Sequence, residues 1–309
     1  HAGALWTTAC AFTVLLSAAG ERWHFAGFSK SQEARKARFA RFRALDTIAG
    51  LLPLSPVRRH LLVKDLKVFL RDVSQWSQLL LLVALMLVYL YNFRVLDLDR
   101  LPYMSGVVKN LYAFLNLAMA AFVMSTVAVR FVFPAVSAEG AAFWIIRTAP
   151  ISLRDFLWSK FWTGLVPVLL LTEILIVTGN ELLGVDPFLK RMSAVAIVFM
   201  AFALVGLATG LGARYPRFAA DNPSQVAGSY GGVAFMIVAV LFILVMIALL
   251  GWPSSVYLFS QVRRRPLTGM QQAMFYVCFA SAAILSVAVW LLGMRTGVRA
   301  LEAMDRTPA

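Results

Sequence analysis

The sequence predicts an all-α, polytopic helical membrane protein with about seven transmembrane helices. Of its 309 residues, 61% are hydrophobic and only 14% are charged, whereas a soluble domain carries about 25% charged residues. The apolar residues are also gathered into blocks of roughly 20, which is the length that a helix needs to cross the hydrocarbon core of a bilayer. Composition and block length together therefore indicate a bundle of membrane-spanning helices.

Seven apolar blocks mark the predicted spans. The second is the clearest, because residues 79–88 include no polar side chain. The predicted spans cover residues 2–20, 74–93, 110–133, 161–178, 192–212, 231–252 and 272–294.

Lys and Arg are distributed unequally between the two sides of these spans. Of the 29 Lys and Arg residues, 21 fall on the side that holds the loop 21–72 and the C-terminus, and 8 fall on the other side. Because Lys and Arg are concentrated in cytoplasmic loops, we expect the long basic loop and the C-terminus to lie in the cytoplasm. Membrane orientation also accounts for the formal net charge of +14, so nucleic acid is not expected as a partner.

The sequence suggests three parts along the chain. It begins with His1 and enters an apolar block at once, which is typical of a truncated start, so residues 1–20 are predicted to be the last span of an upstream half. Residues 21–54 form a predicted basic cytoplasmic linker, and the prolines Pro53 and Pro56 mark its end. Residues 55–309 then form a unit of six spans whose two ends both face the cytoplasm.

The segment after Ser55 and Pro56 is predicted to be an amphipathic helix, because these residues suit the N-cap and first turn of a helix. Its apolar and basic residues fall on opposite faces. The apolar face holds Leu62, Leu66, Phe69 and Val73, the basic face holds Lys64, Lys67 and Arg71, and the helix also carries Asp65. A helix of this kind lies in the membrane surface. The alternative is a cytoplasmic helix that packs on its neighbours.

A second short helix is predicted over residues 137–149. Ser137 can cap its N-terminus, Glu139 suits the positive dipole of the first turn, and Arg147 suits the last turn. Such a helix would expose Phe143 and Trp144, which could dock to a partner protein. Alternatively, the two aromatic side chains only anchor the helix at the membrane interface. A new cap, Ser152 with Asp155, is predicted to restart the chain toward the fourth span.

Glu173 is the only acidic residue deep inside a predicted span. A charge at the bilayer centre costs about 3 kcal/mol, so we expect this side chain to face a cavity or a partner helix. It is either a carboxylate of a substrate path or proton relay, or a protonated or hydrogen-bonded packing residue. Two GxxxG spacings, Gly206 with Gly210 and Gly228 with Gly232, predict close approach of helix backbones.

Motifs for catalysis, nucleotide binding and metal binding are missing from the sequence. It contains no GxxxxGK[ST] phosphate loop, no HExxH and no GxSxG, each of which carries a specific chemistry. The three histidines are scattered, and Cys10 and Cys278 lack CxxC spacing. We therefore expect neither enzyme activity nor a metal or cofactor in this chain.

The motifs that match a known family lie between residues 64 and 232. They are Lys64-Asp65-Leu66-Lys67 with Arg71-Asp72, Phe133-Pro134-Ala135-Val136-Ser137 with Glu139-Gly140, Phe143-Trp144, Ala149-Pro150, Lys160-Phe161, and Gly212-Ala213-Arg214-Tyr215-Pro216-Arg217-Phe218 with Asn222-Pro223 and Gly231-Gly232. Together they resemble the permease subunits of ABC-2-type exporters, in particular the ABC exporter group.

The resemblance implies an elbow helix over residues 55–72 and a coupling helix near residues 137–149. Glu139, Phe143, Trp144 and Arg147 would contact a separate ABC ATPase subunit, and ATP and Mg²⁺ would bind to that subunit. The resemblance also implies a partner for the six-span unit, either the missing N-terminal half or a second permease copy. Both would lie in the lipid of the inner (plasma) membrane of a bacterium.

Three functions are therefore compared. The leading hypothesis is the passive permease of an ATP-driven ABC exporter. The alternative is an ion-coupled secondary transporter that uses Glu173. A membrane enzyme acting on lipids would need a cluster of His, Asp or Glu at an interface, and the sequence shows none.

Overall fold

The computed structural model is all-helical in the residues that it describes. These are residues 10–18, 20–21, 56–71, 73–95, 105–220, 222–262 and 268–306. The chain divides into two units, His1–Leu51 and Leu52–Ala309, and the description below concerns the second unit. Residues 10–18 are helical and fall in the first predicted span, but nearly half of that span and nearly all of the linker 21–54 lie outside the described residues. The three-part division of the chain stays a prediction.

Six helices in the described residues are long and apolar enough to cross a membrane, which confirms the predicted fold class of a multi-pass, all-α membrane protein. They are α4 (Val73–Val95), α5 (Ser105–Val127), α7 (Leu153–Leu182), α8 (Pro187–Arg214), α10 (Tyr230–Val262) and α11 (Gly269–Arg306). They correspond to the second to seventh predicted spans. Three extend well beyond their predicted spans, because α7 begins before Phe161, α10 continues past Trp252 and α11 continues past Met294. An apolar block reports only the part of a helix that lies in lipid.

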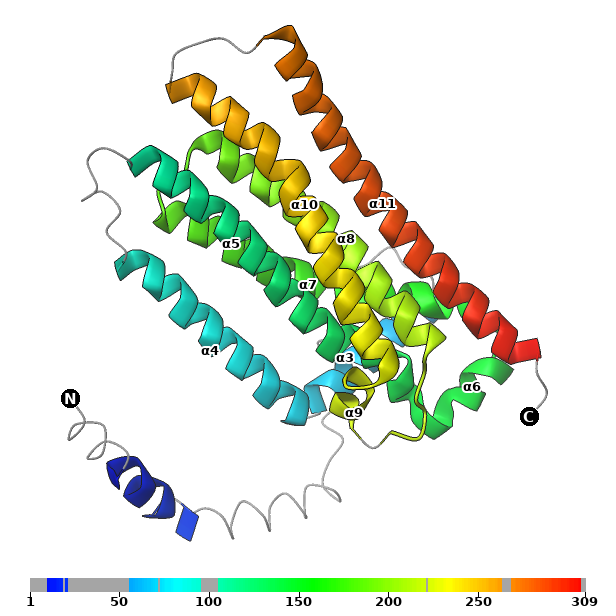
Figure 1. The fold of residues 1–309 in the computed structure, drawn as a ribbon. Coiled ribbons are helices and arrows are strands. Elements are labelled where there is room, and N and C mark those ends of the chain that lie inside the picture. Colours follow the sequence, from blue (N-terminus) through cyan, green and yellow to red (C-terminus); the bar gives the residue numbers. More distant parts are fainter. Residues whose placement is uncertain are drawn as a thin grey trace. The chain divides into compact units, whose positions relative to one another are not determined.

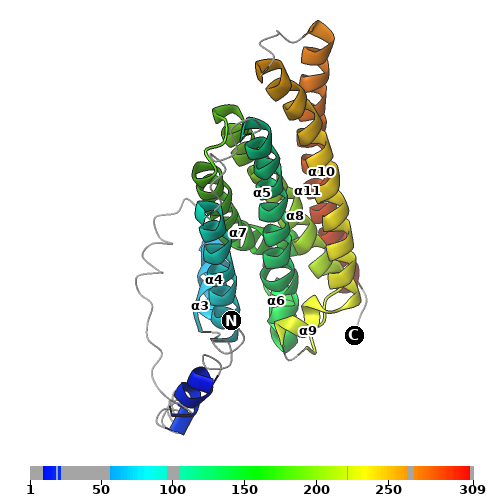
Figure 2. The ribbon, with the colours of Figure 1, turned by 60° about the vertical axis from the view of Figure 1, so that its left-hand side comes forward.

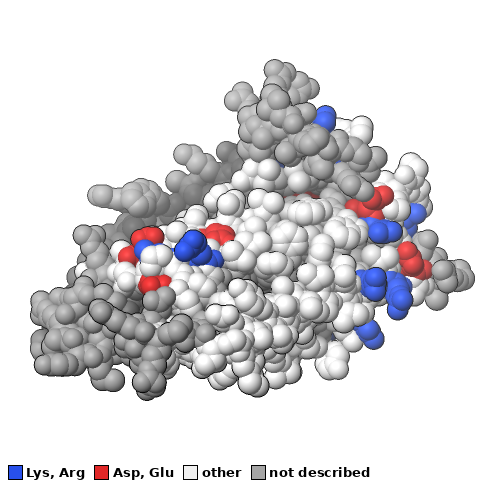
Figure 3. Space-filling model, turned by 90° about the horizontal axis from the view of Figure 1, so that it is seen from above, with Lys and Arg blue, Asp and Glu red and all other residues white. Residues whose placement is uncertain are grey.

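The six helices run alternately up and down (Figure 1). The short helices α3 (Pro56–Arg71), α6 (Phe143–Thr148) and α9 (Pro223–Ala227) lie at the end of the unit where α4 begins and α11 ends. On the face shown in Figure 3, most charged side chains gather toward the two ends, with uncharged residues between them. This is the distribution that a membrane-spanning bundle requires. The assignment of the α3 end to the cytoplasm stays a prediction.

Helix α8 lies in the middle of the bundle (Figures 1 and 2), where it packs on α5, α7, α10 and α11. Its closest neighbour is α11, because Gly206 and Gly210 face Gly293 and Gly297. A Cβ atom on Gly210 would lie 1.9 Å from the carbonyl oxygen of Gly293, so only glycine fits there. The packing role predicted for the first GxxxG spacing is confirmed, and the matching spacing in α11 was not predicted.

The second GxxxG spacing works differently. Gly228 ends α9 and Gly232 belongs to α10, so the spacing spans a junction and not one helix. A Cβ atom on the neighbouring Gly231 would lie 2.6 Å from the Cβ atom of Tyr215. The small residues here allow the start of α10 to pack on the turn that follows α8.

The segment between α5 and α7 differs from the single short helix that the sequence predicts. It continues α5 through a π-helical turn, Ala128–Val132, and two 3₁₀ turns, Phe133–Ala135 and Ser137–Ala142, into α6. Gly140 has a φ of 53°, a conformation that glycine adopts without a steric penalty, and it divides the predicted helix in two. The segment also packs against α8, because a Cβ atom on Gly212 would lie 2.2 Å from the carbonyl oxygen of Phe133.

Two predicted helix caps have different outcomes. Ser152 caps α7 as predicted, since its Oγ accepts a hydrogen bond from the Asp155 N–H at 3.0 Å. Ser137 does not cap a helix with its side chain. Its Oγ instead accepts a hydrogen bond from the Arg217 N–H at 3.0 Å, which ties the 137–142 segment to the turn after α8.

Candidate functional site

Four charged residues from three separate segments meet at the α3 end of the bundle. Lys64 and Asp65 come from α3, Glu139 from the 137–142 segment, and Lys160 from α7; we call these four residues the ionic cluster. The Lys160 Nζ lies 2.7 Å from Asp65 Oδ1 and 2.6 Å from Glu139 Oε1. The Lys64 Nζ lies 2.5 Å from Glu139 Oε1 and 2.7 Å from Glu139 Oε2. Two carboxylates thus balance two ammonium groups.

Lys160 is the buried member of the ionic cluster, and the side chains of Asp65 and Glu139 are largely covered. Side-chain exposure is 7% for Lys160, 11% for Glu139 and 12% for Asp65, but 40% for Lys64. A charge removed from water is tolerated only when it is paired and hydrogen-bonded. Lys160 therefore depends on both carboxylates, while Lys64 closes the cluster from the solvent side.

Sequence analysis named three members of the cluster as candidate residues, but it did not predict that they contact one another. Lys64 was expected on the basic face of its helix, and the structure adds that it pairs with Glu139. Helix α3 packs on α7 and α4, as the alternative of a helix packed on its neighbours requires. Whether it also lies in the membrane surface stays a prediction. Lys67 and Arg71, which were expected to act with Lys64, are not members of the cluster.

Lys160 is the member that sequence reasoning missed. It was quoted only as part of the motif Lys160-Phe161, without a role. Its position in the sequence could have predicted an ion pair, because a lysine directly before the apolar block 161–178 must either reach water or pair with a carboxylate. The structure shows the second case.

The two aromatic residues expected on the coupling helix have different surroundings. Phe143 is buried, with its ring stacked on Phe218 at 4.6 Å between centroids and near Phe156 at 6.1 Å. This corrects the expectation that both rings are exposed. Successive side chains of a helix point in different directions, so Trp144 faces outward and is 63% exposed. Arg147, in the last turn of α6, is also exposed.

Glu173 lies apart from the cluster, thirteen residues after Lys160 on α7. One carboxylate oxygen, Oε1, is buried and has no hydrogen-bond partner among the described residues. On either side along the helix, Thr172 is buried while Ile174 is exposed. Glu173 therefore sits at the edge between the interior of the bundle and its outer apolar face, and its role stays a prediction.

A second polar group, which sequence reasoning missed, joins four spans toward the other end of the bundle. Tyr89 Oη donates to Asn116 Oδ1 at 3.1 Å, Asn116 Nδ2 donates to Asn180 Oδ1 at 2.9 Å, and Asn180 Nδ2 donates to Ser193 Oγ at 2.7 Å. These residues belong to α4, α5, α7 and α8, and we call them the amide network. Its two asparagines and its serine are buried. The signal in the sequence was asparagine in or beside an apolar block.

Neither of these groups is a metal site. Among the described residues, no three or more His, Cys, Asp or Glu side chains lie together so that they could hold a metal ion. In the ionic cluster, both carboxylates pair with lysine side chains.

The comparisons with known proteins give one match. A family model described as "Putative ATP-binding cassette" matches residues 2–306, a range that includes the ionic cluster, α6 and the amide network. Comparison with curated proteins and with solved structures gives no match.

Proposed function

The chain belongs to the "Putative ATP-binding cassette" family, whose model it matches over residues 2–306, and from this premise we propose that it is the transmembrane permease of an ATP-driven exporter. The six candidate spans supply the membrane part of such a machine. A permease also needs a rigid element that receives the movement of an ATPase and passes it to the spans.

The observation that carries the proposal is the ionic cluster. Its ion pairs of 2.5–2.7 Å join α3, the 137–142 segment and α7, so these three elements move together. Helix α3 ends where α4 begins, and the 137–142 segment follows α5 without a long loop. A displacement of the 137–142 segment would therefore reach α4, α5 and α7 at once.

Trp144 offers the contact surface for the ATPase. It is exposed on α6 next to the buried Phe143, so the helix is anchored on one side and free on the other. Tryptophan is enriched among the residues that dominate binding energy in protein interfaces. The ATPase would be a separate subunit that carries ATP and Mg²⁺, which agrees with the lack of a GxxxxGK[ST] loop in these 309 residues. Glu139, in the 137–142 segment, and Arg147, in α6, belong to the same proposed coupling element.

The proposed cycle alternates between cytoplasm-facing and outward-facing states. Closure of the ATPase moves the coupling segment, and the ionic cluster carries this movement to the spans. The partner of the six-span unit is the upstream half of a longer chain or a second permease copy, in the inner membrane of a bacterium. The permease itself catalyses no reaction.

A second candidate is supported by Glu173. Its buried Oε1 without a hydrogen-bond partner among the described residues is a feature of a carboxyl group that takes up and releases a proton. This would suit a secondary transporter, which needs no ATPase. Proton relays in transporters use chains of several ionisable residues, and Glu173 is a single one, so we prefer the exporter.

A co-purification experiment separates the two. The tagged chain is purified in mild detergent from its own cells, and the preparation is tested for a bound ATPase and for ATP hydrolysis after reconstitution into liposomes. The exporter predicts an ATPase subunit whose hydrolysis rises when the permease is present. Transport driven by a proton gradient without ATP, and abolished in Glu173→Gln, would contradict it and favour the secondary transporter.

A further inference from the structure

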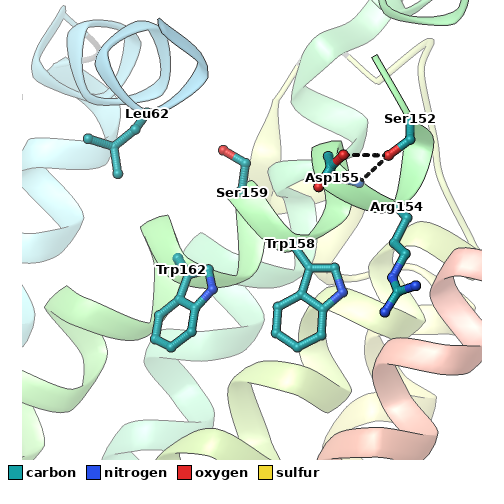
Figure 4. A pocket seen from close by; sticks show the side chains of 7 residues that line it. All are labelled: Leu62, Ser152, Arg154, Asp155, Trp158, Ser159 and Trp162. Carbon is teal, nitrogen blue, oxygen red and sulfur yellow. Dashed lines mark hydrogen bonds between the residues drawn. The ribbon is translucent and has the colours of Figure 1, made fainter. Parts of the chain in front are cut away.

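A pocket of about 550 Å³ lies beside the first turns of α7 (Figure 4). One wall is Leu62 of α3, and the other lining residues come from residues 152–162. Ser159 lines it between the two helices. The proposed ATPase coupling uses none of these side chains.

Three side chains of α7 give the pocket its chemistry. Arg154, Trp158 and Trp162 are spaced at i, i+4 and i+8, and Figure 4 shows them pointing to the same side of the helix. Arg154 makes no hydrogen bond or ion pair in the part of the chain that the structure describes. The guanidinium group is thus available, and its fork of N–H donors matches a phosphate group.

The two indoles are held in place by the bundle. The Trp158 ring meets Trp290 edge-on at 5.9 Å between centroids, and the Trp162 ring meets Phe202 edge-on at 6.1 Å. Trp162 is nevertheless half exposed. Indole rings with one buried and one open side are typical of the membrane interface.

The acidic group of the pocket is turned away from Arg154. The Ser152 Oγ donates to Asp155 Oδ2 at 2.7 Å, and Figure 4 shows this cap on the side of α7 opposite the two indoles. The carboxylate therefore serves the helix terminus, and the side of the pocket with Arg154 stays cationic.

An apolar strip leads out of the pocket. After Trp162, the exposed residues Val166 and Leu170 continue at the same spacing along α7. Arg154 precedes the apolar block at residue 161 by seven positions, a rise of roughly 10 Å along a helix, which matches the depth of the head-group layer. A cation at head-group depth followed by an apolar strip complements an anionic head with a hydrocarbon tail.

We propose that this pocket binds a membrane phospholipid, with its phosphate on Arg154 and an acyl chain along Trp162, Val166 and Leu170. The proposal goes beyond the exporter function and does not depend on an ATPase. The bound lipid would fill the space between α3 and α7 on the membrane-facing side of the elbow.

The test is native mass spectrometry of the purified chain in detergent with three probes. Didecanoyl phosphatidic acid carries phosphate and chains, inorganic phosphate lacks the chains, and didecanoylglycerol lacks the phosphate. We expect binding of phosphatidic acid alone, weakened about tenfold in Arg154→Gln, because a hydrogen-bonded ion pair is lost. The matched control is Arg299→Gln, an exposed arginine of α11 that does not line the pocket, and its affinity should equal that of the unmodified chain.

Each other outcome overturns the proposal. Equal binding of inorganic phosphate would show a site for a free anion, and equal binding of didecanoylglycerol would show an apolar groove without head-group recognition. Equal weakening by Arg299→Gln would show attraction by net charge alone. Trp162→Leu, which removes the indole ring, should reduce the affinity for phosphatidic acid while the melting temperature of the protein changes by no more than a few degrees. An unchanged affinity would show that the acyl chain does not lie along Trp162, Val166 and Leu170, and it would overturn the proposal.

Discussion

The ionic cluster and the amide network both tie several helices together, but they use different chemistry. The cluster joins α3, the 137–142 segment and α7 through full charges, and one member, Lys64, reaches solvent. The network joins α4, α5, α7 and α8 through neutral side chains, with both asparagines and the serine buried. Ion pairs at the edge of water can shift as one body against the solvent, whereas neutral hydrogen bonds in a dry interior have no water to replace them. We therefore propose that the cluster moves as a unit while the network stays fixed.

Removal of Lys160 should have the largest effect on stability. Lys160→Met leaves the largely covered carboxylates of Asp65 and Glu139 close together, with only the more exposed Lys64 to balance them. Breaking a buried ion pair costs about 3–5 kcal/mol, to be measured as the free energy of unfolding in mild detergent. The control is Lys190→Met, which breaks the exposed 2.6 Å pair with Glu181 and should cost below about 1 kcal/mol.

The double variant Lys160→Met, Glu139→Gln sharpens this prediction. It removes one charge of each sign, so it should recover part of the stability lost in Lys160→Met. If Lys160→Met lost no more free energy of unfolding than Lys190→Met, burial would not determine the strength of the ionic cluster. The proposed difference between the cluster and the amide network would then be wrong.

Disruption of the amide network should have an intermediate effect. Asn116→Leu removes the donor to Asn180 Oδ1 and the acceptor for Tyr89 Oη. Unsatisfied buried polar groups cost about 1–3 kcal/mol, again measured by unfolding in detergent. Asn92→Leu is the control, because Asn92 is exposed and, among the described residues, bonds to the Val88 carbonyl of its own helix. Equal losses in the two variants would mean that the network adds no stability of its own.

A smaller effect is expected at Gly179, which lies against the network. A Cβ atom there would lie 2.7 Å from Asn116 Nδ2 and 2.9 Å from Asn116 Oδ1, so Gly179→Ala should displace the amide at a cost of about 1 kcal/mol. The cost should shrink in an Asn116→Ala background, since the displaced group is then absent. Additive losses in this double-mutant cycle would place the strain elsewhere.

The smallest change in stability, yet a large change in binding, is expected at Trp144. Trp144→Ala removes an exposed side chain, so unfolding should shift by less than about 0.5 kcal/mol. The affinity for the ATPase should fall roughly thirtyfold, as expected for loss of an aromatic anchor. Ile145→Ala, which is also exposed on α6, is the control and should bind normally. If the Trp144→Ala variant bound the ATPase with unchanged affinity, Trp144 would not contact the ATPase, and α6 would serve only as an anchor at the membrane surface.

The spans were predictable because a block of apolar residues has only one stable position in a membrane protein. The start of α7 and the end of α11 could not be predicted, because both helices extend into polar sequence that a hydropathy pattern does not detect. Packing of Gly206 and Gly210 was predictable from spacing, whereas their partners Gly293 and Gly297 depend on which helices adjoin.

The candidate site could be read from the sequence only as separate residues. Lys64 and Glu139 are 75 residues apart, and Asp65 and Lys160 are 95 apart, so no local periodicity brings them together. The exposure of Phe143 was misjudged because the position of Phe218, which covers it, depends on the turn after α8. Asn116 was overlooked because a single amide hardly changes the hydropathy of an apolar block.

We propose that the ionic cluster transmits the ATPase movement to the spans, and a distance measurement between two spin labels can detect this transmission. Labels are introduced at Tyr91→Cys, near the end of α4, and at Met274→Cys, near the start of α11, with Cys10 and Cys278 replaced by Ser. Both labelled positions are exposed. With the ATPase bound, ATP and vanadate should shift the distance in the otherwise unmodified chain and in Glu181→Gln, but not in Glu139→Gln. An equal shift in Glu139→Gln would show that the ATPase movement reaches the spans without the ionic cluster.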